Sequence, residues 1–335
     1  DGNPYNDIFL IATSYYDDKG RVIQELSDNI KSAVDYSTIQ YNYAGRTLSV
    51  CDKHTMPGTS VTSFETISKL EYDRIGRISI FSKKFGNLAY KKLAQYTYDE
   101  YGRVKNKKLS PDYNSGTGIE NLTYSFNIQG WLTGINKDYA LANTALNQWD
   151  HYFGMYLGYE NRDNLFTNKQ YNGNLTGIIW KTQGDNMPRR YDYDYDNVNR
   201  FTKALFVQKA KPTDASWNGN SMNFSVTDIL YDDNSNLKQM YQKGMIPGNN
   251  SPVYIDRLTY DYKQLAGAEW SNQLRRVYDQ PDLTSANNGS LGDFKDETFG
   301  VNGEDYSFDG NGNLLKDNNK KIRIGGASGV VYNFM

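Results

Sequence analysis

Hydrophobic and polar residues alternate in short stretches along most of the chain, and a turn signal follows each stretch. In the clearest case, Tyr96 and Tyr98 are separated by one polar residue, so both rings lie on one face of an extended segment. Asp99 comes next, and an aspartate that opens a type I turn can accept hydrogen bonds from backbone N–H groups two residues on. Gly102 then supplies the positive φ that closes such a turn with a one-residue bulge, and Arg103 begins the returning strand. The stretch predicts the tip of a β-hairpin.

The same six-residue pattern, Tyr-Asp-x-x-Gly-Arg, returns from one end of the chain to the other. Its copies, some of them loose, begin at Tyr16, Tyr41, Tyr72, Tyr98, Phe126, Tyr195, Tyr231 and Phe308. We expect the turns to be set by Asp17, Gly20, Gly45, Asp73, Gly76, Asp99, Gly102, Gly130, Asp196, Asn199, Asp232, Asp309 and Gly312. Asn199 stands where glycine is expected, and asparagine tolerates the left-handed region, whereas Ser235 fits that position less well. Residues 171–175 are a shortened relative, and residues 258–262 keep the strand but lose the turn glycine.

The repeats predict an all-β fold, a repeat array of antiparallel β-hairpins. Spacings such as Tyr16 to Tyr41 lie within the period of roughly 20–50 residues that is typical of solenoids and arrays. Repeats of this kind stack because a single hairpin cannot bury its own apolar face. We expect an N-terminal set of repeats in residues 1–135 and an irregular insertion in residues 136–165, with one short helix possible over residues 139–146. Residues 166–335 then form a C-terminal set that is continuous with the first.

Residues 15–22, 126–132, 171–175 and 309–314 carry a family resemblance. They resemble the YD-repeat proteins of the Rhs and teneurin type, and more narrowly their relatives in Bacteroidetes. In that family the repeats form a long antiparallel sheet that spirals into a hollow shell, often around a toxic C-terminal segment. The resemblance therefore implies a curved or spiralling sheet that is part of the wall of a secreted or surface-exposed shell. The sequence has no Asp-Pro step, so the self-cleavage common in Rhs-type shells is not expected here.

Composition fits this picture and excludes several classes of function. Hydrophobic residues make up 38% of the chain and 29 tyrosines stand against 14 phenylalanines, which suits a sheet with one packed face and one wet face. A net charge of −2, from 37 basic and 39 acidic residues, gives no field for nucleic acid. No run of about 18 apolar residues is present, so we expect no membrane-spanning segment. Cys51 is the single cysteine, which excludes an internal disulfide and a multi-cysteine metal site.

Both ends of the sequence read as the ends of an internal fragment. We therefore expect flanking repeats and a C-terminal segment of a parent protein as partners, and an extracellular or cell-surface location follows from the resemblance alone. Cut sheet edges also predict possible edge-to-edge self-association.

Several groups of residues could carry a metal or a catalytic reaction, and a purely structural role explains each of them more simply. Asp192, Asp194 and Asp196 alternate with tyrosines, which predicts a solvated strand face; glycine and glutamate are missing from the places where a calcium loop needs them. Residues 309–313 fail the same test, and a turn suffices for them. His54 lies near Cys51, but no nucleophile elbow accompanies them, and His151 sits among aromatic residues. Paired acids occupy repeat turns. We expect no catalytic residue, cofactor or metal ligand.

Exposed tryptophans stack on sugars, which gives an alternative function. The candidates are Trp131, Trp149, Trp180, Trp217 and Trp270. Trp131 and Trp180 have apolar neighbours and read as core, whereas Trp217 lies in a polar stretch and is the expected glycan contact. The principal hypothesis is a non-catalytic structural module that encloses or presents another segment. The alternative is a carbohydrate-binding or adhesin-type surface, and the sequence gives no positive sign of a hydrolase.

Overall fold

A computed structural model describes most of the chain: residues 10–29, 32–56, 62–142, 151–160, 164–217, 222–246, 251–264, 270–280, 293–294, 303–319 and 322–323. The chain divides into two compact units, residues 1–125 and residues 126–335. Within the described residues, all regular structure is β except one five-residue helix, α1 (Lys137–Leu141). The all-β fold class that the repeats predict is confirmed. Residues 143–146, the second half of the expected helix, lie outside the described residues.

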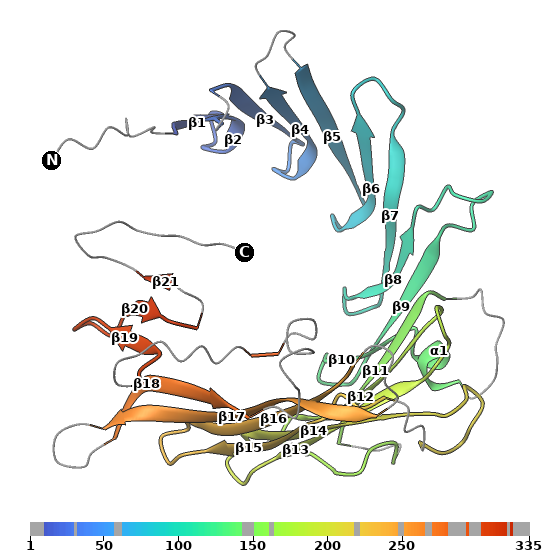
Figure 1. The fold of residues 1–335 in the computed structure, drawn as a ribbon. Coiled ribbons are helices and arrows are strands. Elements are labelled where there is room, and N and C mark those ends of the chain that lie inside the picture. Colours follow the sequence, from blue (N-terminus) through green and yellow to red (C-terminus); the bar gives the residue numbers. More distant parts are fainter. Residues whose placement is uncertain are drawn as a thin grey trace, which may run out of the picture. The chain divides into compact units, whose positions relative to one another are not determined.

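Unit 1 is a succession of hairpins in which each strand pairs antiparallel with the next one in the chain (Figure 1). Its strands are β1 (Ala12–Tyr16), β2 (Val22–Asp28), β3 (Val34–Tyr41), β4 (Thr47–Met56), β5 (Thr62–Tyr72), β6 (Ile78–Phe85), β7 (Lys91–Tyr98), β8 (Val104–Leu109) and β9 (Glu120–Phe126), the last residue of which falls in unit 2. In four of these hairpins the register shifts by one residue just before the motif tyrosine. A one-residue bulge of this kind adds local twist to a hairpin.

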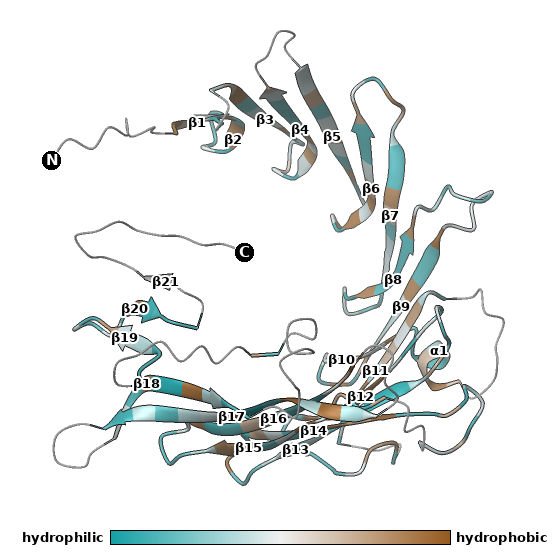
Figure 2. Ribbon diagram, in the orientation of Figure 1, coloured by the Kyte–Doolittle hydropathy of each residue, from teal (hydrophilic) through white to brown (hydrophobic). Residues whose placement is uncertain are grey.

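The described part of unit 1 is a single layer with little core. Ala94, 3% exposed, and Pro111 are the only buried apolar residues among those described there. Hydrophilic and hydrophobic residues are interspersed along its strands (Figure 2). One face carries polar side chains that bond across strands: Asn106 donates to Thr97, and Thr123 donates to Asn106. With so little apolar area removed from water, specific contacts between hairpins have to contribute much of the stability.

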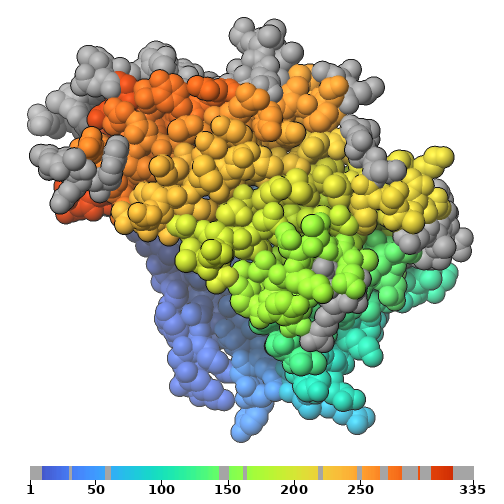
Figure 3. Space-filling view, turned by 90° about the horizontal axis from the view of Figure 1, so that it is seen from below, coloured from blue at the N-terminus to red at the C-terminus, as the bar shows by residue number. Residues whose placement is uncertain are grey.

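Unit 2 contains a longer run of strands, α1 and a small separate sheet. Its strands are β10 (Leu132–Ile135), β11 (Phe153–Tyr159), β12 (Leu175–Thr182), β13 (Arg189–Tyr195), β14 (Phe201–Gln208), β15 (Val226–Tyr231), β16 (Leu237–Met245), β17 (Pro252–Gln264), β18 (Trp270–Asp279), β19 (Tyr306–Phe308), β20 (Leu314–Asp317) and β21 (Ile322–Arg323). Strands β10 to β18 pair antiparallel in chain order, and β19 to β21 form the small sheet. Strands β11 to β18 form successive bands of surface from green to orange (Figure 3).

Unit 2 has the hydrophobic core that unit 1 lacks. Tyr156, Phe166 and Ile179 form a buried cluster on β11, β12 and the segment between them. The Phe166 ring lies directly on two glycines that pair across strands, Gly158 and Gly177. A Cβ at either glycine would come within 2.1–2.3 Å of this ring, so only glycine leaves room for it. The irregular segment before β12 is thereby held against the sheet.

Candidate functional site

All eight copies of the motif form the same closed turn. In each, the backbone N–H of the Asp or Asn at position two donates to the carbonyl of the residue four places on. The N–H of the residue at the glycine position donates to the carbonyl of the same Asp or Asn. Gly76 has φ of 88° and Gly102 has φ of 83°. Asn199 and Ser235, which replace glycine, both have φ of 66°, so the turn keeps its geometry without glycine.

The residue that ends the motif fastens the turn from outside. Arg77 Nε donates to Asp73 Oδ2 at 2.7 Å, while the Arg77 backbone N–H donates to Asp73 Oδ1 at 2.9 Å. Where asparagine replaces arginine, its amide fills the same role, as Asn313 does toward Asp309 at 2.8 Å. Hydrogen bonds from the side chain and backbone of Arg21 lower the pKa of Asp17 to about 2. These carboxylates are therefore charged at all ordinary pH values.

Successive hairpins are fastened to one another by a tyrosine, which is the first residue of a motif copy in five cases and Tyr262 of the looser stretch 258–262 in the sixth. Its hydroxyl donates to the backbone carbonyl of the residue that directly follows the preceding turn. We call this contact a joint. Six joints are present in the described residues: Tyr41 to Val22 (2.9 Å), Tyr72 to Thr47 (2.6 Å), Tyr98 to Ile78 (2.7 Å), Tyr195 to Leu175 (3.0 Å), Tyr231 to Phe201 (2.7 Å) and Tyr262 to Leu237 (2.9 Å).

Four joints are covered by the arginine of the preceding turn. The guanidinium lies over the ring of the joint tyrosine, as Arg77 lies over Tyr98 with 4.2 Å between the Cζ atom and the ring centroid. Arg21 over Tyr41, Arg46 over Tyr72 and Arg200 over Tyr231 repeat this arrangement. Each such arginine therefore contacts its own turn or hairpin and the next hairpin.

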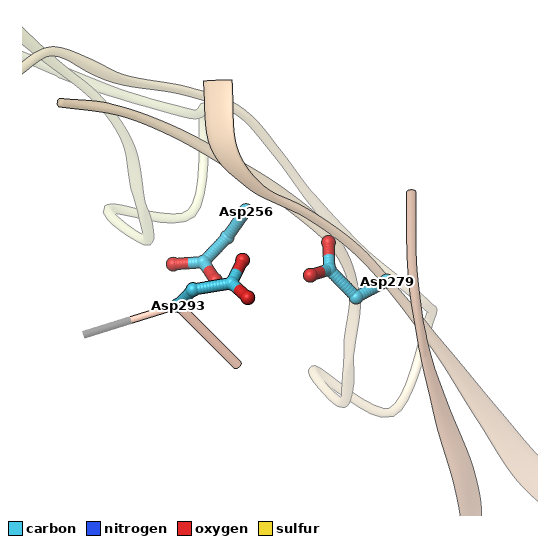
Figure 4. A group of neighbouring side chains, drawn as sticks. All are labelled: Asp256, Asp279 and Asp293. Carbon is cyan, nitrogen blue, oxygen red and sulfur yellow. The ribbon is translucent and has the colours of Figure 1, made fainter. Parts of the chain in front are cut away.

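A second group of residues brings three carboxylates together, and the sequence analysis did not single it out. Asp256 of β17, Asp279 at the end of β18 and Asp293 offer oxygens that lie within 4.8 Å of one another (Figure 4). Asp256 accepts from the Phe294 N–H, and Asp279 accepts from the Arg257 N–H, both at 2.8 Å. Carboxylates at this separation can share protons or hold a hard cation such as Ca²⁺.

The electrostatics of this cluster raise the pKa of two of its members, Asp279 and Asp256. Burial, reinforced by the charges of Asp256 and Asp293, raises the pKa of Asp279 to about 6. Burial also raises the pKa of Asp256, against the hydrogen bond that it accepts from Phe294. The three aspartates come from segments far apart in sequence, and no local spacing in the chain marks them.

One expectation about the alternating Asp and Tyr residues of β13 is wrong. Asp192 does not lie on a solvated face: it is 4% exposed, pairs with Arg190 at 2.8 Å and accepts from the Thr167 N–H at 3.1 Å. The segment around Thr167 covers this part of the strand, because Arg190 also donates to the Leu165 carbonyl. Burial consequently raises the pKa of Asp192.

Cys51 and His54 lie three residues apart on the same strand, β4, whereas His151 lies in unit 2. His54 Nδ1 lies 2.8 Å from Asp35 on the neighbouring strand. Burial, followed by the charges of nearby acids, raises the pKa of Cys51, which disfavours the nucleophilic thiolate. His151 stands edge-on to Tyr139 with 5.7 Å between ring centroids.

Two of the tryptophans, Trp217 and Trp131, are placed differently from what their sequence neighbours suggested, whereas Trp180 packs against Tyr191 and Phe206 as expected of a core residue. Trp217 is half-buried: it packs against the Tyr156–Phe166–Ile179 cluster, with the cations of Arg190 and Lys209 over its ring. Trp131, expected in the core, is 39% exposed. Trp149 lies outside the described residues, as does the side chain of Trp270. Among the three tryptophans whose side chains the structure describes, the exposed ring is that of Trp131, because the polarity of sequence neighbours does not determine tertiary packing.

A hollow of about 280 Å³ lies near the start of unit 2, and Trp131 is not among the residues that line it. Tyr159, whose ring centroid is 5.2 Å from that of Trp131, lines it together with Gln129, Thr133 and Glu160. Lys137 also lines it, with its Nζ atom 4.4 Å from the Tyr156 ring centroid. Aromatic faces next to hydroxyl, amide and charged groups can in principle hold a small polar ligand.

Among the described residues, no helix is long and apolar enough to span a membrane.

Comparisons with known proteins give weak likenesses. No protein-family model matches the chain, and no curated protein matches it. A solved structure described as TcdB2-TccC3-Cdc42 is 11% identical with a TM-score of 0.23; the match covers 82% of this chain, which spans only 20% of that one. A porin-like protein from Bacteroides uniformis is 11% identical with a TM-score of 0.25, over 77% of this chain and 91% of that chain. At these TM-scores neither likeness carries an argument.

Proposed function

We propose that this chain is a non-catalytic structural module, one part of the wall of a secreted or surface-exposed shell built from YD-type hairpins. Its task is to enclose or present a segment that lies outside residues 1–335. The observation that carries this proposal is the series of six joints, which fasten hairpin to hairpin without a buried core in unit 1.

The chemistry of the joints suits a wall. A neutral hydroxyl-to-carbonyl bond contributes about 1 kcal/mol, and repetition makes the sum large. A covering arginine adds roughly 0.5–1 kcal/mol at an exposed ring. Because each contact links chain neighbours, hairpins can be added without redesigning a common core.

Limited proteolysis of the natural polypeptide that contains this sequence tests the proposal. The variant to use combines Arg77→Ala with Tyr98→Phe, which opens one joint. Its control combines Arg74→Ala with Tyr101→Phe, since Arg74 and Tyr101 are exposed turn residues outside any joint. We expect a segment outside residues 1–335 to be protected in the wild type and control, and to be cut faster in the joint variant.

Equal digestion of that segment in all three proteins, with the hairpin array intact, would contradict an enclosing role. The array would then act as a scaffold or as an adhesin-type surface, and its own outer face would be the place to seek a partner.

A carbohydrate-binding surface is the second candidate. Two observations favour it: Trp131 is exposed, and its ring contacts that of Tyr159, which lines the 280 Å³ hollow. Screening the full chain on a broad glycan panel tests this function. Binding should fall at least tenfold in Trp131→Ala, because a sugar stacks its apolar face on an exposed aromatic ring and the variant lacks this ring. Trp217→Ala is the comparison, because the Trp217 ring is half-buried and already covered by cations. If the chain binds none of the glycans on the panel, the carbohydrate-binding function is ruled out.

A further inference from the structure

The first hairpin carries a joint tyrosine whose joint is open. Tyr41, Tyr72 and Tyr98 are each half-buried, bonded to the preceding turn and covered by its arginine. Tyr16 holds the same place in the first copy, yet it is 59% exposed. Within the described residues, no hydrogen bond of its hydroxyl and no cation over its ring is recorded.

Among the strands that the structure describes, the one that carries Tyr16 pairs on one side only. Strand β1 pairs with β2 from Ala12 to Tyr16, and the pairing continues to Ile11, whose N–H and carbonyl both bond to Asp28. In the other hairpins of unit 1, the tyrosine-bearing strand also pairs on its second side, with the last strand of the preceding hairpin. The second side of β1 therefore corresponds to the side where the other hairpins receive a neighbour.

The composition of this edge supports the same conclusion independently. Natural sheet edges are usually blunted by charged residues, proline or inward-pointing charges. Residues 10–16, Leu-Ile-Ala-Thr-Ser-Tyr-Tyr, contain neither charge nor proline. Leu10 and Ile11 are 54% and 63% exposed, and Tyr15 is 50% exposed. An edge without such protection is suited to being covered.

The geometry of the closed joints defines what would cover it. The incoming strand must run antiparallel to β1, as β2 does to β3. Its turn must end in arginine, to cover the Tyr16 ring, and the next residue must offer its carbonyl to the Tyr16 hydroxyl. Arg21, Arg46, Arg77 and Arg200 already lie over tyrosines of the next hairpin. Arg103 also ends a Gly-Arg turn, but the strand that follows it, β8, is already paired on both sides, with β7 and β9. A second copy of the chain therefore offers none of these five turns.

We infer that the β1 edge is a docking surface for a β-hairpin of the same class, located outside residues 10–323, whose turn ends Gly-Arg. This inference rests on the proposed structural function and specifies one partner of the wall. The bound hairpin extends the sheet by backbone pairing along residues 10–16, and Tyr16 selects it by the joint.

A peptide taken from the chain itself provides the probe. Residues 66–85 form the hairpin that presents Arg77 and Ile78 to Tyr98, and its end residues Thr66 and Phe85 face each other in register. Backbone cyclisation keeps this hairpin folded, since an isolated two-stranded hairpin is only marginally stable. Binding of the labelled cyclic peptide to the full chain is followed by fluorescence anisotropy, with hydrogen exchange at the β1 amides as the second readout.

We expect the peptide to bind wild-type protein and to slow exchange in β1. Tyr16→Phe removes only the hydroxyl and should weaken binding about fivefold, the equivalent of about 1 kcal/mol. Tyr16→Ala should weaken it more than tenfold, and an Arg77→Ala peptide about fivefold. Tyr15→Ala is the matched control, because successive side chains of a strand point to opposite faces; it should leave binding unchanged.

Absence of binding to the wild type, or equal binding by wild type and Tyr16→Ala, would overturn the inference. So would equal loss in Tyr15→Ala, which would indicate general adhesion to exposed aromatic rings. Tyr16→Phe keeps the ring, so it tests the joint even if the alanine variant misfolds. The proteolysis test of the enclosing role uses the Arg77–Tyr98 joint, so the two proposals can fail separately.

Discussion

At the scale of single residues, the arginine that ends the motif makes two contacts at once, one within its own turn and one with the next hairpin. Arg77 closes its own turn on Asp73 and covers Tyr98 of the next hairpin. A lysine at this place could supply charge but lacks the planar fork that bonds a carboxylate and stacks on a ring at once. This explains why one residue type recurs at the end of so many copies.

Arg77→Ala should lower the thermal midpoint of the chain. Loss of the ring contact with Tyr98 costs about 1 kcal/mol, and the turn loses its side-chain bond as well. Arg74→Ala, three residues earlier on the exposed turn, is the control and should leave the midpoint unchanged. Calorimetry of both variants measures this, and equal midpoints would show that the arginine is dispensable.

Gly76→Val should destabilise the protein by roughly 2 kcal/mol or more, because a β-branched residue is strained at positive φ. A Cβ at Gly76 would also meet the Arg46 guanidinium at 2.0 Å and would displace this group from the joint with Tyr72. Gly310→Val serves as comparison, since a Cβ there meets no atom within 4 Å. Urea unfolding followed by circular dichroism would reveal an unchanged midpoint if this argument were wrong.

At the scale of elements, hairpin tips could be predicted from sequence because their chemistry is local. Aspartate and glycine three residues apart suffice to define the turn around Asp99. The joints were missed because each connects residues about one repeat apart, and the bond is visible only once neighbouring hairpins are paired. The signal was nevertheless present, since a tyrosine precedes nearly every turn and an arginine ends most of them.

Tertiary packing accounts for what the sequence could not provide. The polar neighbours of Trp217 suggested exposure, yet the fold brings it against Phe166 and other core residues. Asp192 alternates with tyrosines as a solvated residue would, but a connecting segment covers it. The cluster of Asp256, Asp279 and Asp293 joins three segments that only the fold brings together.

Tyr98→Phe isolates the contribution of one joint hydroxyl. The ring and its arginine stay, while the 2.7 Å bond to the Ile78 carbonyl is lost, so we expect about 1 kcal/mol of destabilisation. Tyr101→Phe is the control, because the Tyr101 side chain is 84% exposed. Urea titrations of the two variants should differ in midpoint, and coincident curves would remove the hydroxyl from the account of the joint.

At the scale of the whole molecule, stability should pass through a maximum at mildly acidic pH. The raised pKa of Asp279, about 6, means that the folded chain takes up a proton before the unfolded chain does, so stability rises as pH falls from above 6 to about 4. The lowered pKa of Asp17, about 2, has the opposite sign: its contribution is complete above about 4 and is lost as pH falls toward 2. Thermal midpoints across pH 2–8 measure both limbs.

Asp279→Asn separates the pH dependence of stability that comes from Asp279 from the part that comes from Asp17. The amide oxygen can still accept from the Arg257 N–H, while the charge facing Asp256 and Asp293 is gone. We expect a higher midpoint than wild type at pH 7.5 and a small difference at pH 4.5. Asp233→Asn, on an exposed turn, is the control. A lower midpoint at pH 7.5 would show that the ionised cluster stabilises the fold.

The joints also bear on how the chain reaches its fold. Every joint connects a hairpin to its immediate predecessor, so the contacts that define unit 1 close loops of about one repeat, and their entropic cost is small and nearly constant. Folding can then begin at any hairpin and spread to both sides, as in a one-dimensional lattice. Breaking one joint in the middle of the array should divide a single unfolding transition into two.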